Sequence, residues 1–66
     1  MVDDDAIDPL ERAAVLEATD PIVNDHLGDA YWAVGREREA RFQWLRAQSF
    51  EPEEDLAARI RAKLER

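Results

Sequence analysis

The sequence predicts an all-α fold, an antiparallel stack of about four helices in a single domain. Helix start signals recur three times along the 66 residues, at Asp8-Pro9, Asp20-Pro21 and Pro52-Glu53. An aspartate before a helix accepts backbone N–H bonds, and a proline fits the first helical turn. Between these signals, apolar residues recur three or four positions apart, which is the period of one helix face. A glycine at position 35 ends one helix inside the middle segment, so three signals give four helices.

The charge of the chain is negative and unevenly spread. The net charge is −7. Residues 1–30 hold nine acids and one base, which give −8, and residues 31–66 hold seven acids and eight bases, which give +1. This distribution argues against binding of a nucleic-acid backbone, which needs clustered lysine and arginine. It favours a basic partner, or it serves solubility.

Composition limits several other functions. The chain has no cysteine, so it forms no disulfide and no cysteine-ligated metal site. No apolar run approaches the roughly 20 residues of a membrane-spanning helix. Residues 1–5 are mostly acidic and lack the basic start of a secretory signal. The compartment stays open between the cytoplasm and, for a longer parent with its own signal, the periplasm.

The first helix is expected to start at Asp8. Asp8 serves as the N-cap, Pro9 takes the first helical position, and Glu11 reaches back as in a capping box. An alternative start lies near Asp4, with Pro9 tolerated inside the helix. The apolar face of this helix is predicted to consist of Leu10, Ala13, Ala14 and Val15.

Two helices are expected in the middle of the chain, over residues 21–34 and 37–49. The first carries a glycine, Gly28, which costs roughly 1 kcal/mol relative to alanine inside a helix. Close approach of a neighbouring helix would offset that cost, with Ala40 and Ala47 as the small surfaces that permit it. A generic helical hairpin is the alternative interpretation. The apolar face of the first middle helix comprises Val23, Leu27, Ala30, Tyr31 and Val34.

The last helix follows a break at residues 50–55. Acids fill its first turn and bases its last, which suits the helix dipole at both ends. Leu56, Ile60 and Leu64 form one apolar stripe, and the remaining positions are mostly polar. A helix with one apolar and one polar face is what closes the end of a helical repeat array.

The middle segment has the residue spacing of a helical repeat. At the fixed intervals of such a repeat, the segment carries Leu27, Gly28, Tyr31, Ala40, Trp44, Ala47 and Pro52. On these positions it resembles one complete tetratricopeptide repeat of about 34 residues. Asn24 departs from the pattern, because it stands where the family has a bulky residue, and this weakens one contact between helices.

The resemblance implies a division of the chain and a function. Residues 21–54 correspond to the full repeat, residues 1–20 to the second half of a preceding repeat, and residues 53–66 to a C-terminal capping helix. The chain is similar to the C-terminal end of bacterial tetratricopeptide proteins. We therefore expect a protein–protein interaction module, a scaffold or adaptor, without catalysis. The alternative is a structural fragment that self-associates or caps a longer array.

The resemblance also implies a binding groove, because the first helix of each repeat lines the concave face in this family. The ligand-contacting positions fall on Ile22, Asp25, Asp29, Trp32 and Ala33. Asp25 and Asp29 are one turn apart and share a helix face, and Trp32 offers an anchor or a surface for a cation. A basic or amphipathic peptide is the expected partner. In the alternative interpretation the aspartates are solvated and Trp32 packs internally.

Catalytic and metal sites are not expected. The sequence has no nucleophile–base arrangement and no phosphate-binding glycine loop. Asp25, His26 and Asp29 lie within one helical turn, but no second histidine and no cysteine complete a metal site. We predict no enzyme activity, no cofactor and no metal. The basic and amide residues that clamp a peptide's terminal carboxylate in chaperone-binding relatives are also missing.

Self-association is the last expectation. About three tetratricopeptide repeats are usually needed for a stable array, and this chain has about one and a half with a cap. The side of the first helix around Leu10 and Ala14 lacks a covering helix. Closed two-fold dimers are the commonest solution for such a surface, so we predict a homodimer.

Overall fold

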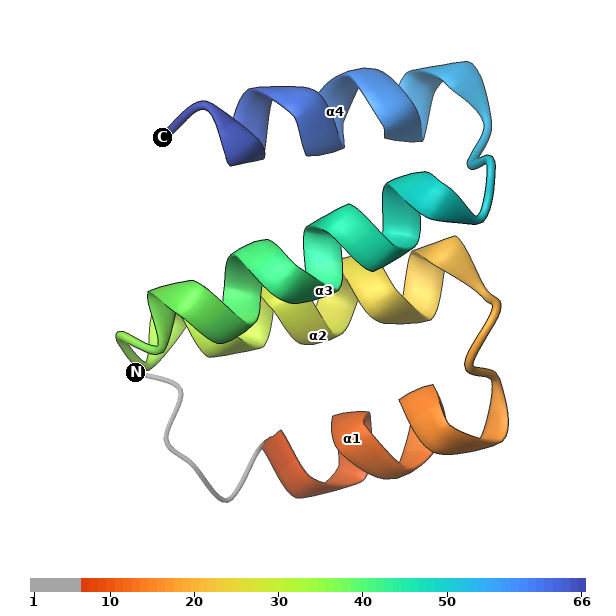
Figure 1. Ribbon diagram of the computed structural model, residues 1–66. Helices are drawn as coiled ribbons and strands as arrows, with labels where there is room; N and C mark the ends of the chain where they lie inside the picture. The colour runs from red at the N-terminus through yellow and green to blue at the C-terminus, as the bar shows by residue number, and fades with distance from the viewer. Residues whose placement is uncertain (1–6) are drawn as a thin grey trace.

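The computed structural model describes residues 7–66 and confirms the all-α prediction. The four helices are α1 (Ile7–Leu16), α2 (Pro21–Ala33), α3 (Glu37–Ser49) and α4 (Glu54–Leu64), and the described residues form no strand. Successive helices run antiparallel, and the α1–α2 and α3–α4 connections lie at the same end of the molecule (Figure 1). Helices α2 and α3 pair in the middle, between α1 on one side and α4 on the other.

The predicted start of α1 is wrong in detail. The helix already includes Ile7, so Asp8 lies in its first turn and does not cap it. There its carboxylate still faces the positive end of the helix dipole. The alternative start near Asp4 lies outside the described residues. Of the predicted apolar face, Leu10 and Ala14 pack against the core, whereas Val15 is 78% exposed.

The predicted bounds of the two middle helices are confirmed to within a residue. The carboxylate of Asp20 accepts a hydrogen bond of 2.9 Å from the backbone N–H of Ile22, and Pro21 is the first helical residue. Helix α2 ends at Ala33, and Gly35 follows with φ of +82°, a left-handed conformation that favours glycine. Local signals therefore account for both ends of α2.

At Gly28, α2 packs so closely on α3 that no side chain fits between them. A Cβ atom at this position would lie 2.5 Å from both Cδ1 and Nε1 of the Trp44 indole, and 3.1 Å from the backbone oxygen of Ala40. Ala40, Trp44 and Ala47 are fully buried against α2. The close approach predicted from the mid-helix glycine is confirmed, with Ala40 at the contact. The nearest side chain, however, is the large indole of Trp44 and not the small Ala47.

Asn24, the departure from the repeat pattern, is a connector between α1 and α2. Its side chain is buried, and its amide donates hydrogen bonds to the backbone oxygens of Ala18, at 3.0 Å, and Asp20, at 2.9 Å. A bulky apolar residue could not bind these two oxygens. The polar side chain therefore fixes the turn that brings α1 onto α2.

Helix α4 is attached at three places along its length. Leu56 and Ile60 are buried in the core, and Leu64 packs at its edge, as the predicted apolar stripe requires. The side chain of Gln48 donates to the backbone oxygen of Ala57 at 3.2 Å. At the C-terminal end, Arg41 of α3 donates to the backbone oxygens of Leu64 and Arg66, at 3.0 and 2.6 Å. The bond to Leu64 satisfies a carbonyl that the helix end leaves unpaired.

Candidate functional site

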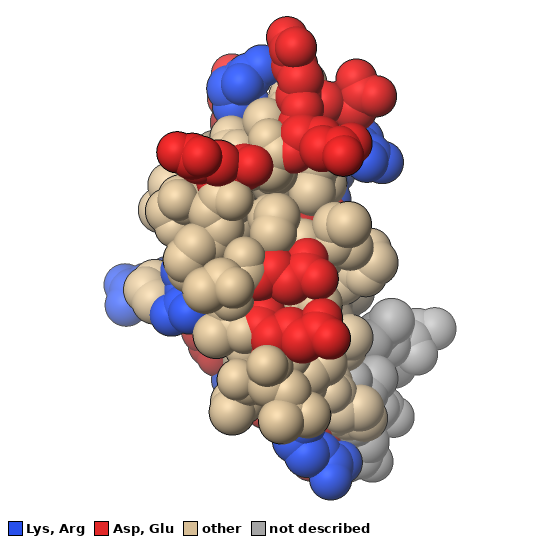
Figure 2. All heavy atoms as spheres, turned by 90° about the vertical axis from the view of Figure 1, so that its right-hand side faces the viewer, with Lys and Arg blue, Asp and Glu red and all other residues tan. Residues whose placement is uncertain are grey.

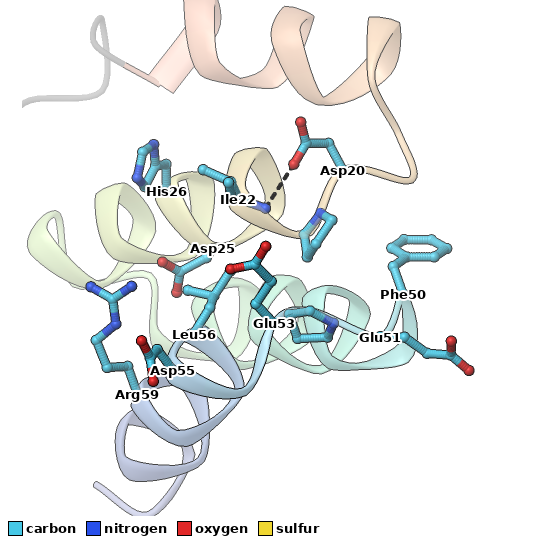
Figure 3. A pocket seen from close by; sticks show the side chains of 12 residues that line it. Asp20, Ile22, Asp25, His26, Phe50, Glu51, Glu53, Asp55, Leu56 and Arg59 are labelled. Atoms are coloured by element: carbon cyan, nitrogen blue, oxygen red, sulfur yellow. Dashed lines mark hydrogen bonds between the residues drawn. The ribbon is translucent and has the colours of Figure 1, made fainter.

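A cavity of about 550 Å³ lies between the beginnings of α2 and α4. Its wall on one side is the first turn and a half of α2, and on the other the turn after α3 and the start of α4 (Figure 3). The apolar part of the lining consists of Pro21, Ile22, Phe50, Pro52 and Leu56. Ile22 is more than half exposed, so an apolar side chain from a partner has a surface to bury.

The same cavity is surrounded by acidic side chains. Its charged lining comprises Asp20, Asp25, Glu51, Glu53 and Asp55 against a single arginine, Arg59. Figure 2 looks at this end of the molecule and shows acidic side chains gathered toward the top and again in the middle, with basic ones at the edges. In Figure 3, Glu53 points into the space between the helices, whereas Glu51 points away from it. An acidic rim over an apolar floor suits a ligand that is both basic and apolar.

Beyond the cavity, the same two helices are joined by ion pairs. Lys63 of α4 places its Nζ 2.8 Å from Asp25 Oδ1 and 2.9 Å from Asp29 Oδ1. Asp25 is only 4% exposed, and the side chain of Lys63 is 18% exposed. Burial alone lowers the pKa of Lys63, but the hydrogen bonds and charges of the two aspartates outweigh it and raise the pKa above its ordinary value. Lys63 is therefore held as the ammonium ion.

The predicted groove residues divide into two groups. Ile22 and Asp25 line the cavity. Asp29 is not part of the lining. Like Asp25 it binds Lys63, and it also accepts a hydrogen bond of 3.2 Å from the indole N–H of Trp44. Ala33 is exposed at the far end of α2.

Trp32 is half-buried against the core, as the internal-packing alternative expects. Its ring centroid lies 5.6 Å from that of Trp44 in a tilted arrangement. The guanidinium groups of Arg41 and Arg66 lie over its ring, 5.7 and 5.5 Å from the centroid. The side chain thus already stacks on cations of its own chain.

The sequence reasoning missed the part of the site that comes from the turn before α4 and from α4 itself. Its members include Phe50, Glu53, Asp55, Leu56, Arg59 and Lys63. Arg59 and Lys63 are one turn apart in α4, so helical spacing places them on one side of that helix. Spacing does not reveal that this side faces α2. The two cations could have been assigned to the groove only from the packing of α4 on the α2–α3 pair.

The predicted self-association surface is partly covered. Leu10 and Ala14 are half-buried against α2, whereas Val15 and Leu16 at the end of α1 are 78% and 84% exposed. On the buried side of α1, the hydroxyl of Tyr31 donates a 2.5 Å hydrogen bond to Glu11. Burial, and then this bond to a carboxylate, raise the pKa of Tyr31 to about 12.

The described residues also bear on metals and membranes. Between Ile7 and Arg66, no group of three or more histidine, aspartate or glutamate side chains is arranged to hold a metal ion. His26 is exposed at the margin of the cavity. None of the helices over the same residues has the length and apolar character needed to cross a membrane.

Comparison with known proteins adds no relative. No family model matches the chain, no curated protein matches it, and no solved structure matches its fold.

Proposed function

We propose that this chain is a protein–protein interaction module of the tetratricopeptide type that has no catalysis of its own. The observation that carries the proposal is the cavity between α2 and α4, with its acidic rim and apolar floor. Packing supports the repeat interpretation, because Gly28, Ala40 and Trp44, three of the positions that match the repeat, meet where α2 and α3 are in contact. The proposed ligand is a basic, amphipathic segment of another protein.

The ligand's chemistry follows from the lining. An apolar side chain would bury itself against Ile22 and Leu56, and a neighbouring lysine or arginine would lie against Glu53 and Asp55. Exposed charges at a rim contribute mainly to association rate and specificity, while the apolar contact supplies much of the affinity. Added salt should therefore slow association more than it speeds dissociation.

The test is charge reversal at the rim. The variant Glu53→Lys with Asp55→Lys leaves the apolar floor in place, and binding of a labelled peptide that repeats lysine and leucine on opposite helix faces is followed by fluorescence anisotropy. Asp25 is not used, because a lysine there would be buried against Lys63. The matched control is Asp8→Lys with Glu37→Lys, two exposed acids that also lie in first helical turns, away from the cavity.

We expect the rim variant to lose at least tenfold in affinity and the control to lose less than threefold, since reversal of a contacting charge costs about 1 kcal/mol or more. Equal losses in the two variants would show that only net charge matters. Unchanged binding in both would refute the cavity as the site.

Self-association is a second candidate function, favoured by the exposure of Val15 and Leu16 at the end of α1. Apolar side chains exposed next to each other often mark a contact surface. Sedimentation tests a homodimer: Val15→Ser with Leu16→Ser should shift the wild-type dimer to monomer, whereas Leu45→Ser, an equally apolar exposed site on α3, should not. Because the first half of the chain is acidic, salt should strengthen the dimer. A wild-type monomer at high micromolar concentration in low and high salt would refute it.

A further inference from the structure

Helix α2 presents two carboxylates to a single ammonium group of α4. The Nζ of Lys63 lies 2.8 Å from Asp25 Oδ1 and within 3.0 Å of both carboxylate oxygens of Asp29. The indole ring of Trp44 completes the surroundings, with its centroid 5.9 Å from the same nitrogen. The carboxylates on one side and the aromatic face on another both stabilise the positive charge of the ammonium group.

Asp29 is held in place independently of Lys63. The Trp44 indole is fully buried, and its Nε1 donates to Asp29 at 3.2 Å, which orients that carboxylate. Asp25 is almost completely buried in α2 and also lines the cavity. The two carboxylates thus continue the proposed binding cavity along the line between α2 and α4.

Lys63 enters this place from the last turn of α4, at the end of a long flexible stem. The buried anchors Leu56 and Ile60 lie nearer the start of the helix, and Arg41 holds the backbone beyond Lys63. A change of side-chain rotamers is therefore enough to withdraw the ammonium without unfolding α4. The vacated carboxylates would then accept another ammonium.

We propose that Asp25, Asp29 and Trp44 form an exchangeable lysine subsite, which Lys63 fills in the free protein and which a lysine of the bound partner takes over. The claim that a partner's lysine takes over the subsite rests on the proposed binding of a basic segment. The claim that the subsite exchanges one ammonium group for another does not. Lys63 then acts as an internal competitor, and it selects partners whose lysine reaches past the cavity to Asp25.

The first test removes the internal ammonium and supplies an external one. In Lys63→Ala the space is open, and n-propylammonium chloride is titrated while the thermal midpoint is recorded against sodium chloride of equal concentration. We expect propylammonium to raise the midpoint saturably in Lys63→Ala and to act like sodium in the wild type. If Lys63→Ala is unfolded at the start, circular dichroism follows its refolding in the same titration.

Two controls separate the subsite from general charge effects. Arg59→Ala removes a cation one turn earlier in the same helix and should show no specific response to propylammonium. Adding Asp29→Asn to Lys63→Ala should abolish the response. A propylammonium effect no larger than that of sodium, or one equally large in Arg59→Ala, would overturn the subsite.

The second test measures competition. The lysine–leucine peptide should bind Lys63→Met at least fivefold more tightly than the wild type, because an internal competitor is gone. Arg61→Met, which removes an exposed cation of α4 outside the cavity lining and changes the net charge equally, should not gain as much. A peptide with norleucine for lysine should lose the gain. Equal affinity for wild type and Lys63→Met would overturn the competition while leaving the cavity proposal intact. A peptide that binds neither protein would refute the cavity proposal, and the propylammonium titration would still decide the subsite.

Discussion

Substitution of Gly28 tests the packing on which the fold depends. In a helix that merely tolerated its glycine, Gly28→Ala would stabilise the protein by roughly 1 kcal/mol through helix propensity. Here the added Cβ would lie 2.5 Å from two atoms of the Trp44 ring, far inside ordinary contact distance. Helix propensity raises the free energy of unfolding and the steric overlap lowers it. The sign of the measured change therefore shows whether Gly28 is exposed or packed against α3.

The size of the destabilisation depends on whether the atoms near the added methyl group can move away. The Trp44 ring is fully buried between the helices, and the third close atom is the backbone oxygen of Ala40, so no flexible side-chain end can give way. Overpacking of this kind costs about 1–3 kcal/mol. After the propensity gain, Gly28→Ala should destabilise by up to about 2 kcal/mol, and Gly28→Leu by more. For a domain of this size, each kcal/mol lowers Tm by about 4–8 °C.

Thermal and urea unfolding, followed by circular dichroism, give the stability differences. Ala58→Gly on the exposed side of α4 measures the propensity contribution in the same protein. A double-mutant cycle of Gly28→Ala with Trp44→Phe should show favourable coupling of about 1 kcal/mol or more, because the smaller ring makes room for the methyl group. A higher Tm for both Gly28→Ala and Gly28→Leu, with no coupling to Trp44, would refute the close contact and with it the central support for the repeat interpretation.

Three further predictions concern single side chains. Asn24→Ala should cost about 1–3 kcal/mol in urea unfolding, because it leaves the backbone oxygen of Ala18 without its donor, while the oxygen of Asp20 keeps only the backbone N–H of residue 24. Glu51→Gly should stabilise by up to about 1 kcal/mol, since Glu51 has φ of 54° in the turn before α4, and a lower Tm would contradict this. The pKa of Tyr31 is raised in the folded state, so the unfolded tyrosine ionises first as the pH rises. The contribution of Tyr31 to the free energy of unfolding is therefore complete below pH 10 and is lost between about pH 10 and 12. Tyr31→Phe should flatten that part of the stability–pH curve, and an identical alkaline slope in both proteins would contradict the assignment.

Much of the fold could be predicted because its signals are local. Asp20, Pro21 and Gly35 act through their own backbone geometry, so the bounds of α2 followed from the sequence. The mid-helix position of Gly28 predicted a close neighbour, because a glycine there is otherwise costly. The start of α1 was misplaced because a proline fits any position in the first turn of a helix. Placing Pro9 at the first helical position, with Asp8 as its cap, was only one of these choices.

The candidate site was predicted only in part, because its contacts join residues far apart in sequence. Asp25 and Asp29 were correctly placed on one helix face, but their neighbour Lys63 lies more than thirty positions away, on a helix whose orientation about its own axis depends on packing. Asn24 was interpreted as a weakened contact because the pattern describes apolar packing. Its actual role, to bind two backbone oxygens in the α1–α2 turn, depends on a turn geometry that no spacing rule describes.

The uneven charge of the sequence is partly resolved by the fold, and what is left over indicates where a ligand would bind. Helix α4 brings Lys63 onto Asp25 and Asp29 and so neutralises acids of the chain's acidic half. Among the described residues, no ion pair forms at Glu53 or Asp55, which line the cavity beside exposed Ile22. A basic segment therefore gains most at the cavity end, where its charge meets carboxylates that are already in place. Farther along α2 it must displace Lys63, so the affinity of a longer ligand depends on whether its own lysine binds there better than the chain's.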